Sequence, residues 1–396
     1  MEDILQKILR AKVYDVAVET PLEKAKKLSK RFKNTIWLKR EDLQPVFSFK
    51  LRGAYNRMSK LSKEELGKGV VASSAGNHAQ GVALSASFLN CKAVIVMPIT
   101  TPPVKIQAVR SLKAEVILHG ETYDEAYLEA KSISKQHGMV FIHPFDDPEV
   151  IAGQGTIGLE ILRQIQEPPH AIYIAVGGGG LIAGIAAYIK NLWPNVKIIG
   201  VEPKDAAAMT ESLKADRRIE LSNVGLFADG VAVKQVGQLT FELAKKYVDE
   251  MITVNTDEIC AAIKDFYEDT RGILEPAGAL SIAGLKSHCK KYNIKDTNLI
   301  AITCGANMNF ERLRFVAERA ILGESKEAMI AIEIPEKSGS LRELCKVINS
   351  RNLTEFSYRM SQEDKAQIFM GVEVENKADR LSLLTQIKNK GFKCID

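Results

Sequence analysis

The stretch AIYIAVGGGGLIAGIAAYIKNLW, residues 171–193, runs from an apolar strand-like segment through four consecutive glycines into a helical pattern. Because glycine lacks a side chain, the backbone from Gly177 to Gly180 can wrap closely around a ligand. The N–H groups at the start of the following helix point toward that ligand, and the helix dipole favours an anion there. This stretch therefore predicts a strand, a phosphate-binding loop and a helix of an α/β fold.

The same alternation of strands and helices extends in both directions from this stretch. The runs GVVAS, KAVIVMP, AEVILHG and MVFIHPF precede it, and VKIIGVEP, EMITV and NLIAITCGAN follow it, with helical patterns between them. Such alternation is typical of βαβ units on parallel sheets. We predict a two-lobed α/β region over residues 1–320, with a smaller lobe of about residues 50–145 and a larger lobe made of residues 1–49 and 146–320.

The pattern changes after a predicted linker at residues 321–328. Residues 329–396 alternate in the order strand, helix, strand, strand, helix and short strand. This βαββαβ order predicts a ferredoxin-like domain. A chain of 396 residues is long enough for more than one hydrophobic core.

Composition excludes several classes of protein. The 54 Lys and Arg residues and 49 Asp and Glu residues are interspersed and leave a formal charge of +5, which does not indicate a nucleic-acid-binding surface. We find no apolar run of the ~20 residues that span a bilayer and no signal-peptide pattern, so we expect a cytoplasmic protein without a membrane partner. The six cysteines form no CxxC pair, which favours reduced thiols.

Two further loops contain groups that could bind a ligand. SSAGNHAQG, residues 73–81, could hold a carboxylate at a helix N-terminus, with Asn77 free to bond a ring substituent. TCGAN, residues 303–307, follows the last strand of the larger lobe, and ligands of α/β sheets bind beyond such strand ends. The plainer interpretations are a capped helix start, a structural His78 and an inert buried thiol at Cys304.

Lys50 stands between Phe49 and Leu51 in SFKLRGAY, residues 48–55, at the start of a predicted helix. Apolar neighbours disfavour the charged amine, which lowers the pKa of a lysine and makes it a nucleophile toward aldehydes. Together with a phosphate loop, such a lysine suggests pyridoxal phosphate bound as a Schiff base. A nicotinamide oxidoreductase is the rival hypothesis, but Ile182 stands where its glycine fingerprint requires a third glycine.

Several motifs together resemble one enzyme family. In order they are KREDLQPVFSFKLRGAY, SSAGNHAQGVA, VIAGQGT, GGGGLIAG, GLFADGVAV, EPAGAL and GAN. They are similar to those of the biosynthetic threonine deaminases, also called threonine ammonia-lyases, which have the tryptophan synthase β-like fold. The likeness runs from about residue 12 to residue 320, and the tail resembles their ACT-like regulatory domain.

The resemblance implies a role for individual residues. Lys50 would form the Schiff base and later take the Cα proton, Phe49 would pack on the cofactor ring, and Asn77 would bond the ring hydroxyl. Cys304 would lie opposite the pyridine nitrogen. The residues implied to hold the cofactor are Lys50, Phe49, Asn77, Gly177, Gly178, Gly179, Gly180, Leu181 and Cys304. Those implied to hold the substrate are Ser74, Gly76, Asn77 and Gln154.

Two positions depart from what relatives carry. The biosynthetic enzymes usually have serine at the position of Cys304, whereas related serine dehydratases have cysteine. A thiol with a pKa near ~8.5 is neutral at pH 7, so it does not force a proton onto the ring nitrogen. A serine-preferring L-serine/L-threonine dehydratase is therefore the alternative function. Ala75 replaces the second serine of serine racemases, so we expect racemisation to be minor.

The resemblance also implies a cation near VEPKDAAA. Glu202 and backbone oxygens around Ala206 would be its ligands, and Ala208 lacks the carboxylate of relatives that use divalent ions, so a monovalent ion is expected. A surface salt bridge of Glu202 is the alternative.

The implied partners are small molecules and further subunits. The substrates would be L-threonine and, secondarily, L-serine, and threonine would give 2-oxobutanoate and ammonia in the first step of isoleucine biosynthesis. Isoleucine would inhibit through the tail, and a homotetramer is expected. An amino-acid-binding regulatory protein without activity is the remaining alternative.

Overall fold

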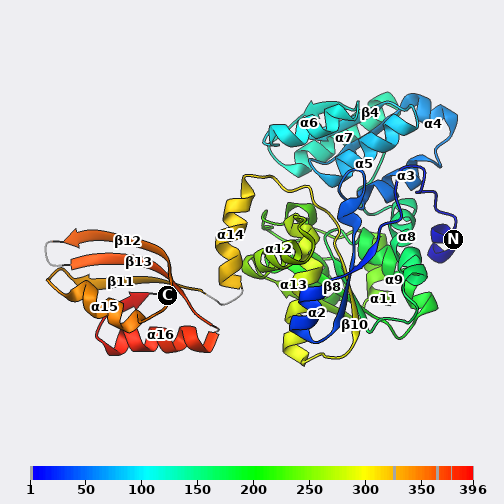
Figure 1. The fold of residues 1–396 in the computed structure, drawn as a ribbon. Helices are drawn as coiled ribbons and strands as arrows, with labels where there is room; N and C mark the ends of the chain where they lie inside the picture. The colour runs from blue at the N-terminus through cyan, green and yellow to red at the C-terminus, as the bar shows by residue number, and fades with distance from the viewer. Residues whose placement is uncertain (1–2, 324–326, 363–364, 376, 396) are drawn as a thin grey trace. The chain divides into compact units, whose positions relative to one another are not determined.

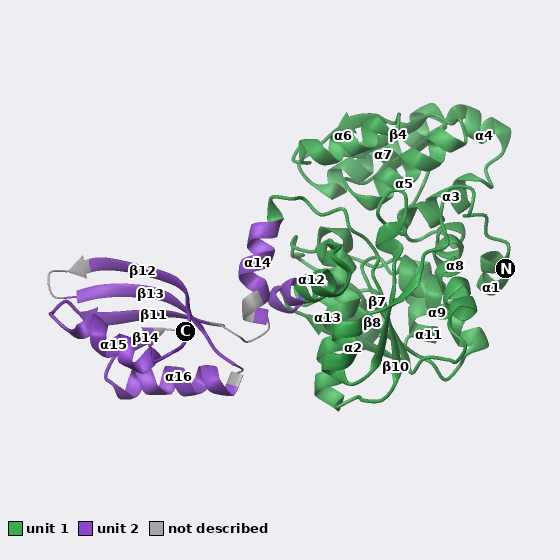
Figure 2. Cartoon of the chain, viewed as in Figure 1, with its two compact units in different colours: residues 1–255, 262–312 green, residues 256–261, 313–396 purple. Residues whose placement is uncertain are grey.

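The computed structural model describes residues 3–323, 327–362, 365–375 and 377–395. They divide into two compact units, coloured separately in Figure 2. Unit 1 comprises residues 1–255 and 262–312, and unit 2 comprises residues 256–261 and 313–396. No helix among the described residues combines the length and the apolar character needed to cross a bilayer.

The larger sheet of unit 1 has the strand order β1-β2-β10-β7-β8-β9. All neighbours pair in parallel except β1, which pairs antiparallel with β2 at the edge. The central strand β7 is buried along its whole length, as expected for a parallel strand covered on both faces. The strands are β1 (Leu22–Lys24), β2 (Thr35–Lys39), β7 (Ala171–Ala175), β8 (Lys197–Pro203), β9 (Glu250–Val254) and β10 (Asn298–Ile302).

Helices surround this larger sheet, as Figure 1 shows. Helix α13 packs against β7, β8, β9 and β10. The helices of this part are α1 (Ile4–Leu9), α2 (Lys26–Phe32), α8 (Pro148–Gln164), α9 (Gly180–Leu192), α10 (Ala208–Lys214), α11 (Gln238–Tyr247) and α13 (Pro276–Tyr292), with 3-10 turns η1 (Glu41–Leu43) and η2 (Asp229–Val231). Helix α12 (Thr256–Thr270) is divided between the units, because its residues 256–261 belong to unit 2.

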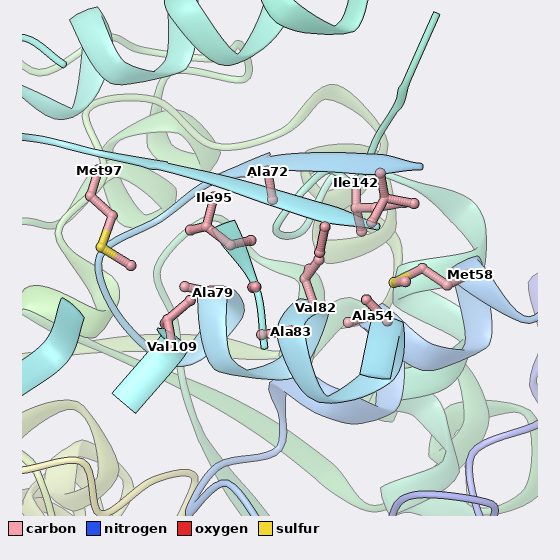
Figure 3. Close-up of a cluster of buried hydrophobic side chains, with 14 of the residues drawn as sticks. Ala54, Met58, Ala72, Ala79, Val82, Ala83, Ile95, Met97, Val109 and Ile142 are labelled. Carbon is pink, nitrogen blue, oxygen red and sulfur yellow. The ribbon is translucent and has the colours of Figure 1, made fainter. Parts of the chain in front are cut away.

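The smaller sheet has the order β5-β4-β3-β6, and all its neighbours are parallel. Apolar residues of α3 and α5 cover one face, among them Ala54, Met58 and Val82, which belong to one buried cluster with Ile95 and Ile142 (Figure 3). Helix α7 covers the other face. The elements are α3 (Lys50–Met58), α4 (Lys63–Lys68), β3 (Val70–Ser73), α5 (Asn77–Phe88), β4 (Ala93–Met97), α6 (Pro103–Ser111), β5 (Glu115–Leu118), α7 (Tyr123–His137) and β6 (Val140–Phe141).

Glycines bring three helices of unit 1 into close contact. A Cβ atom at Gly153 of α8 would lie 2.6 Å from the Cα of Gly53 in α3. A Cβ atom at Gly184 of α9 would lie 2.6 Å from the N atom of Gly155 in α8. Real Cβ atoms do not approach so closely, so only glycine allows this packing. Helix α8 thus links α3, which begins with Lys50, to α9, which begins at the glycine loop.

Unit 2 contains the ferredoxin-like domain predicted for the tail. Its antiparallel sheet has the order β12-β13-β11-β14 and encloses its own apolar core with two helices. This confirms the predicted fold class, a two-lobed α/β region followed by a βαββαβ domain. The elements are α14 (Arg312–Gly323), which begins at the boundary, then β11 (Glu327–Pro335), α15 (Ser340–Ile348), β12 (Leu353–Gln362), β13 (Lys365–Glu373), α16 (Lys377–Asn389) and β14 (Lys393–Ile395).

Candidate active site

Three loops that the sequence singled out follow the carboxyl ends of strands. The glycine loop follows β7, and the loop with Cys304 follows the adjacent strand β10. Residues 74–76 connect β3 to α5, whose first residue is Asn77. Parallel sheets bind ligands at these strand ends. The topology therefore brings the first two loops side by side.

Lys50 is the first residue of α3 and is tied to the loop after β10. The N–H group of Phe49 donates to the carbonyl of Cys304 at 3.3 Å, and Ser48 pairs with Gly305. The amine of Lys50 donates to the carbonyl of Pro144 at 2.9 Å, and its Nζ atom lies 5.4 Å from the centre of the Phe49 ring. These contacts place Lys50 and Cys304 in one site.

Burial lowers the pKa of Lys50 to about 8, although the nearby Cys304 and Glu275 oppose this effect. The direction is the one expected from its apolar neighbours in the sequence. A substantial fraction of the amine is therefore neutral, and nucleophilic, near pH 8.

The glycine loop packs too tightly for side chains. Gly179 has a φ of +95°, and a Cβ atom there would lie 2.7 Å from the Cε of Met209. A Cβ atom at Gly178 would overlap the ring of Phe145. The N–H groups of residues 177–181 donate to no other described residue, as is usual in the first turn of a helix. Since these donors converge on the start of α9, the loop can bind an anion.

Pro144 and Phe145 connect the lysine to this loop. Pro144 accepts the hydrogen bond from Lys50, and the next residue, Phe145, lies against Gly178 and Gly180. An aldehyde reacting with the amine and a phosphate held by the loop can therefore belong to one molecule.

Asn77 belongs to a hydrogen-bonded chain that the sequence did not reveal. Its Nδ2 donates to Oε1 of Glu275 at 2.6 Å, and its Oδ1 accepts from Nδ2 of Asn307 at 2.6 Å. Glu275 is buried, and burial raises its pKa to about 7 while the bond from Asn77 lowers it. Glu275 and Asn307 lie within the motifs EPAGAL and GAN, to which no residue role was assigned. The signal available in the sequence was a glutamate, Glu275, directly before a proline that can start a helix.

Cys304 is buried, and its thiol donates to the carbonyl of Ala277 at 3.5 Å. Burial and, secondarily, the charge of Glu275 raise the pKa of this thiol far above its usual range. The thiol therefore stays protonated and neutral at physiological pH.

The residues predicted to hold the substrate lie in two places. Ser74 accepts a hydrogen bond from the N–H of Gly76 at 3.2 Å, next to Asn77. Gln154 is buried in α8, and its Oε1 accepts from the N–H of Gly53 at 3.2 Å. Its contribution to substrate binding stays a prediction. The buried hydroxyls of Ser48 and Ser73 have no hydrogen-bond partner among the described residues, so they are available to a ligand.

His78 has the structural role expected for it. Its Nε2 lies 2.9 Å from the carbonyl oxygen of Ile142. Burial and the charge of Lys50 lower its pKa to about 3, so it is neutral and a poor base.

Glu202 is buried rather than exposed, so the alternative of a surface salt bridge is wrong. Its carboxylate accepts hydrogen bonds from Met209 N at 2.8 Å and from Thr210 N and Oγ1 at 2.8 and 2.6 Å. It thereby caps α10, and burial raises its pKa to about 7. The described residues contain no cluster of three or more His, Cys, Asp or Glu that could hold a metal ion. A monovalent cation at Glu202 and Ala206 stays a prediction.

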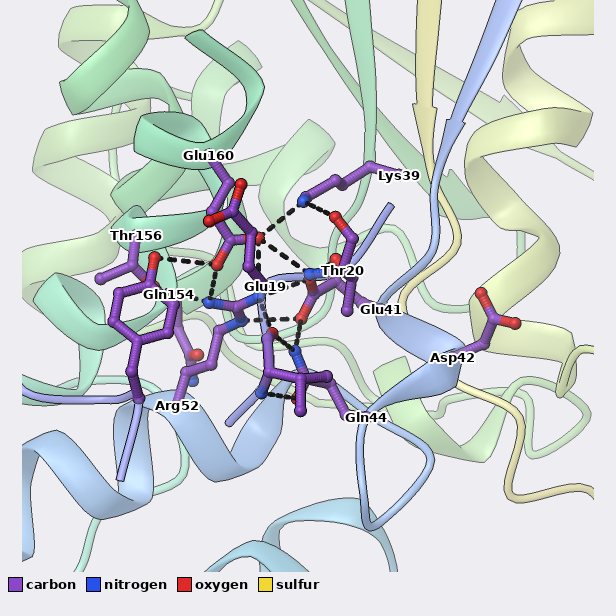
Figure 4. Close-up of polar contacts among 12 residues, drawn as sticks. Glu19, Thr20, Lys39, Glu41, Asp42, Gln44, Arg52, Gln154, Thr156 and Glu160 are labelled. Atoms are coloured by element: carbon purple, nitrogen blue, oxygen red, sulfur yellow. Dashed lines mark hydrogen bonds and ion pairs between the residues drawn. The ribbon is translucent and has the colours of Figure 1, made fainter. Parts of the chain in front are cut away.

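A fully buried ionic cluster connects α3, the helix that begins with Lys50, to neighbouring elements (Figure 4). Arg52 pairs with Glu41 at 2.8 Å and with Glu160 at 2.6 Å, and Lys39 also pairs with Glu160 at 2.6 Å. The two cations and two anions balance, as buried charges must. The cluster ties α3 to β2, η1 and α8, which fixes the position of the segment carrying Lys50.

Comparison with protein families matches both parts of the chain. Residues 13–305 match the model of the pyridoxal-phosphate-dependent enzymes. Residues 318–396 match the model of the C-terminal regulatory domain of threonine dehydratase.

Individual relatives agree with these matches. The chain is 54% identical to L-threonine dehydratase biosynthetic IlvA of Burkholderia multivorans, over all of this chain and 78% of that protein. It is 55% identical to the chloroplastic biosynthetic threonine dehydratase of Arabidopsis thaliana, over all of this chain and 67% of that protein.

Solved structures are similar to about four fifths of the chain. The processed form of threonine deaminase isoform 2 from Solanum lycopersicum superposes with a TM-score of 0.79 at 57% identity, over 80% of this chain and 92% of that one. Maize serine racemase superposes with a TM-score of 0.75 at 30% identity, over 81% of this chain and 99% of that one.

Proposed function

Because the chain belongs to the pyridoxal-phosphate-dependent enzymes and, within them, to the threonine dehydratases, we propose that it deaminates L-threonine to 2-oxobutanoate and ammonia. It is a lyase that uses pyridoxal phosphate. The observation that carries the proposal is the placement of a lysine of lowered pKa beside an anion-binding glycine loop, with Pro144 and Phe145 connecting the two.

The residues of the site fit the cofactor. The glycine loop has the close packing and free N–H groups that a phosphate needs, and the neutral amine of Lys50 can react with an aldehyde. Asn77 would bond the ring oxygen, Phe49 would pack on the ring, and Cys304 would face the ring nitrogen without charging it. When bound, pyridoxal phosphate supplies an electron sink for the carbon next to the substrate amine.

The residues of the chain do the remaining work. Neutral Lys50 takes the proton from the substrate Cα as general base. The carbonyl of Pro144 orients the amine before it does so. Lys50, protonated by this step, can give the same proton to the Cβ hydroxyl, so that the Cβ–O bond breaks and water leaves. The enamine that is set free then takes up one water and hydrolyses to 2-oxobutanoate and ammonia. Ser74 and Gly76, beside Asn77, would hold the substrate carboxylate, and Gln154 would support them.

Cys304 supports a second candidate, a serine-preferring dehydratase of the same fold. Both substrates lose the same groups, so the protonated thiol is compatible with either. Threonine is favoured because the relatives that match the whole chain are named for it.

We extend the proposal to regulation and assembly. The family of the tail supports an effector site, and the first step toward isoleucine is a reasonable point for inhibition by isoleucine. A homotetramer and a monovalent cation at Glu202 and Ala206 complete the proposal. The free state of all six cysteines supports a cytoplasmic location.

Release of 2-oxo acid from threonine and from serine by the purified holoenzyme tests the proposal. We expect threonine to give 2-oxobutanoate with the higher kcat/KM. A higher kcat/KM for serine would establish the second candidate instead. Absence of 2-oxo acid from both substrates would refute both.

A further inference from the structure

Glu275, Asn77 and Asn307 form one hydrogen-bonded chain, in which Glu275 is buried and the two asparagines are half-buried. Asn307 Nδ2 donates to the carbonyl of Val46 at 2.9 Å as well as to Asn77 Oδ1 at 2.6 Å. Backbone closes the other side, because a Cβ atom at Gly305 would lie 3.2 Å from Asn77 Nδ2 and would overlap Glu275. The Asn77 side chain is therefore confined on several sides.

The partners determine which way the Asn77 amide points. The carbonyl of Val46 can only accept, so the NH₂ group of Asn307 faces it and also faces Asn77. The oxygen of Asn77 must then face Asn307, and its NH₂ group must face Glu275. An amide nitrogen carries two hydrogens. Glu275 accepts one of them at 2.6 Å, which leaves one N–H of Asn77 for another acceptor.

We propose that Glu275 is a positioning residue, which fixes the Asn77 amide so that its remaining N–H is directed at the ring oxygen of bound pyridoxal phosphate. The inference rests on the proposed function, which places the cofactor ring beside Asn77. A flipped amide would place its oxygen against the carboxylate and two NH₂ groups against each other. Each unsatisfied buried partner has a substantial cost, so the ionised carboxylate opposes the flip.

Charged groups from several elements act on Glu275. Asp229 of η2 raises its pKa, and Lys105 of α6, which pairs with Asp229 at 2.6 Å, lowers it. Lys50 at the start of α3 and Cys304 after β10 also interact with it. With its pKa at about 7, the carboxyl is neutral below that pH and can then donate as well as accept. The orientation of Asn77 is therefore held more firmly above pH 7 than below it.

The test uses the full chain with pyridoxal phosphate and two readouts other than activity. The first is the dissociation constant of pyridoxal phosphate for the apo-protein, and the second is the visible absorption of the bound cofactor between pH 6 and 9. Glu275→Gln replaces an acceptor-only carboxylate by an amide that can face Asn77 with either its oxygen or its NH₂ group, so Asn77 is no longer held in one orientation. We expect the dissociation constant to rise about tenfold. In the wild-type protein we expect the absorption of the bound cofactor to change near pH 7, where Glu275 titrates. In Glu275→Gln this change should disappear. Glu64→Gln, which removes a surface carboxylate of α4, should behave as wild type.

A second variant keeps the test decisive if Glu275→Gln does not fold. Asn307→Ala removes the opposite anchor and retains Glu275, so the dissociation constant should rise by a similar factor while the pH midpoint stays. Wild-type affinity in Asn307→Ala, or wild-type affinity and pH response in Glu275→Gln, would overturn the inference. Failure of the proposed function would give a different result, because the wild-type protein would then show no visible absorption band with pyridoxal phosphate.

Discussion

The buried surroundings of Lys50 set the reactivity of its amine. Burial lowers its pKa to about 8, so the fraction of neutral amine rises as the pH rises through this value. Because only the neutral amine attacks an aldehyde, the rate at which pyridoxal phosphate reconstitutes the apo-protein should rise with pH and level off above about 8. Stopped-flow absorbance from pH 6 to 10 measures this profile. A midpoint near ~10.4, the value of an unperturbed lysine, would contradict it.

Single residues of the site differed in how far the sequence could reveal them. Lys50 and the glycines were predicted because a lysine among apolar residues and a run of glycines have local physical meaning. Glu275 was missed because its role depends on Asn77, which lies 198 residues away in the chain. The burial of Glu202 was missed for a different reason: its partners, Met209 and Thr210, are close in the chain but belong to the N-terminus of α10, which the sequence pattern did not predict.

Close packing of the glycine loop against Phe145 predicts that an added side chain in the loop weakens cofactor binding. The Cβ atom of Gly178→Ala would push on the Phe145 ring, and overpacking of this kind costs about 1–3 kcal/mol. Because the loop must overcome this cost to keep its phosphate-binding conformation, we expect the dissociation constant of pyridoxal phosphate to rise about 5- to 150-fold, measured by absorbance titration.

Gly67→Ala in α4 is the matched control for this change. An added Cβ atom at Gly67 meets nothing within 4 Å, so cofactor affinity should stay at the wild-type value. Equal affinities in the two variants would contradict the role assigned to the loop.

The buried ionic cluster gives a second prediction at this scale. Arg52→Met leaves Glu41 and Glu160 buried with one cation fewer, which costs about 3–5 kcal/mol of unfolding free energy. Urea unfolding followed by tryptophan fluorescence measures it, because Trp37 and Trp193 both lie in unit 1.

The exposed pair of Lys68 and Glu64 provides the comparison for the ionic cluster. Lys68→Met should lower the free energy of unfolding far less than Arg52→Met, since an exposed i,i+4 pair contributes little. A cost for Arg52→Met as small as this would show that the cluster does not anchor α3.

Regular alternation made the paired strands predictable, whereas β2 and α8 were not singled out from the sequence. The place of β2 in the sheet depends on β10, which lies far along the chain. Helix α8 begins with a local signal, Asp147 before Pro148, but its packing depends on contacts of Gly153 with α3 and of Gly155 with α1 and α9. Such long-range contacts have no local pattern.

At the scale of the whole molecule, the two units have separate tasks in the proposed function. Unit 2 has its own apolar core, and residues 318–396 match a regulatory domain. We expect isoleucine to lower threonine turnover by the full-length protein and to raise its unfolding temperature, as a ligand of the native state does. D-Isoleucine should have neither effect. Unchanged turnover and unfolding temperature with isoleucine would refute the effector proposal and leave the deamination proposal standing.

The most direct test of the central claim is the site at which the cofactor is attached. Holoenzyme is reduced with borohydride in the presence of pyridoxal phosphate, digested, and analysed by mass spectrometry. We predict that the pyridoxyl group is found on Lys50. Its attachment to another lysine, or its absence from every peptide, would contradict the account.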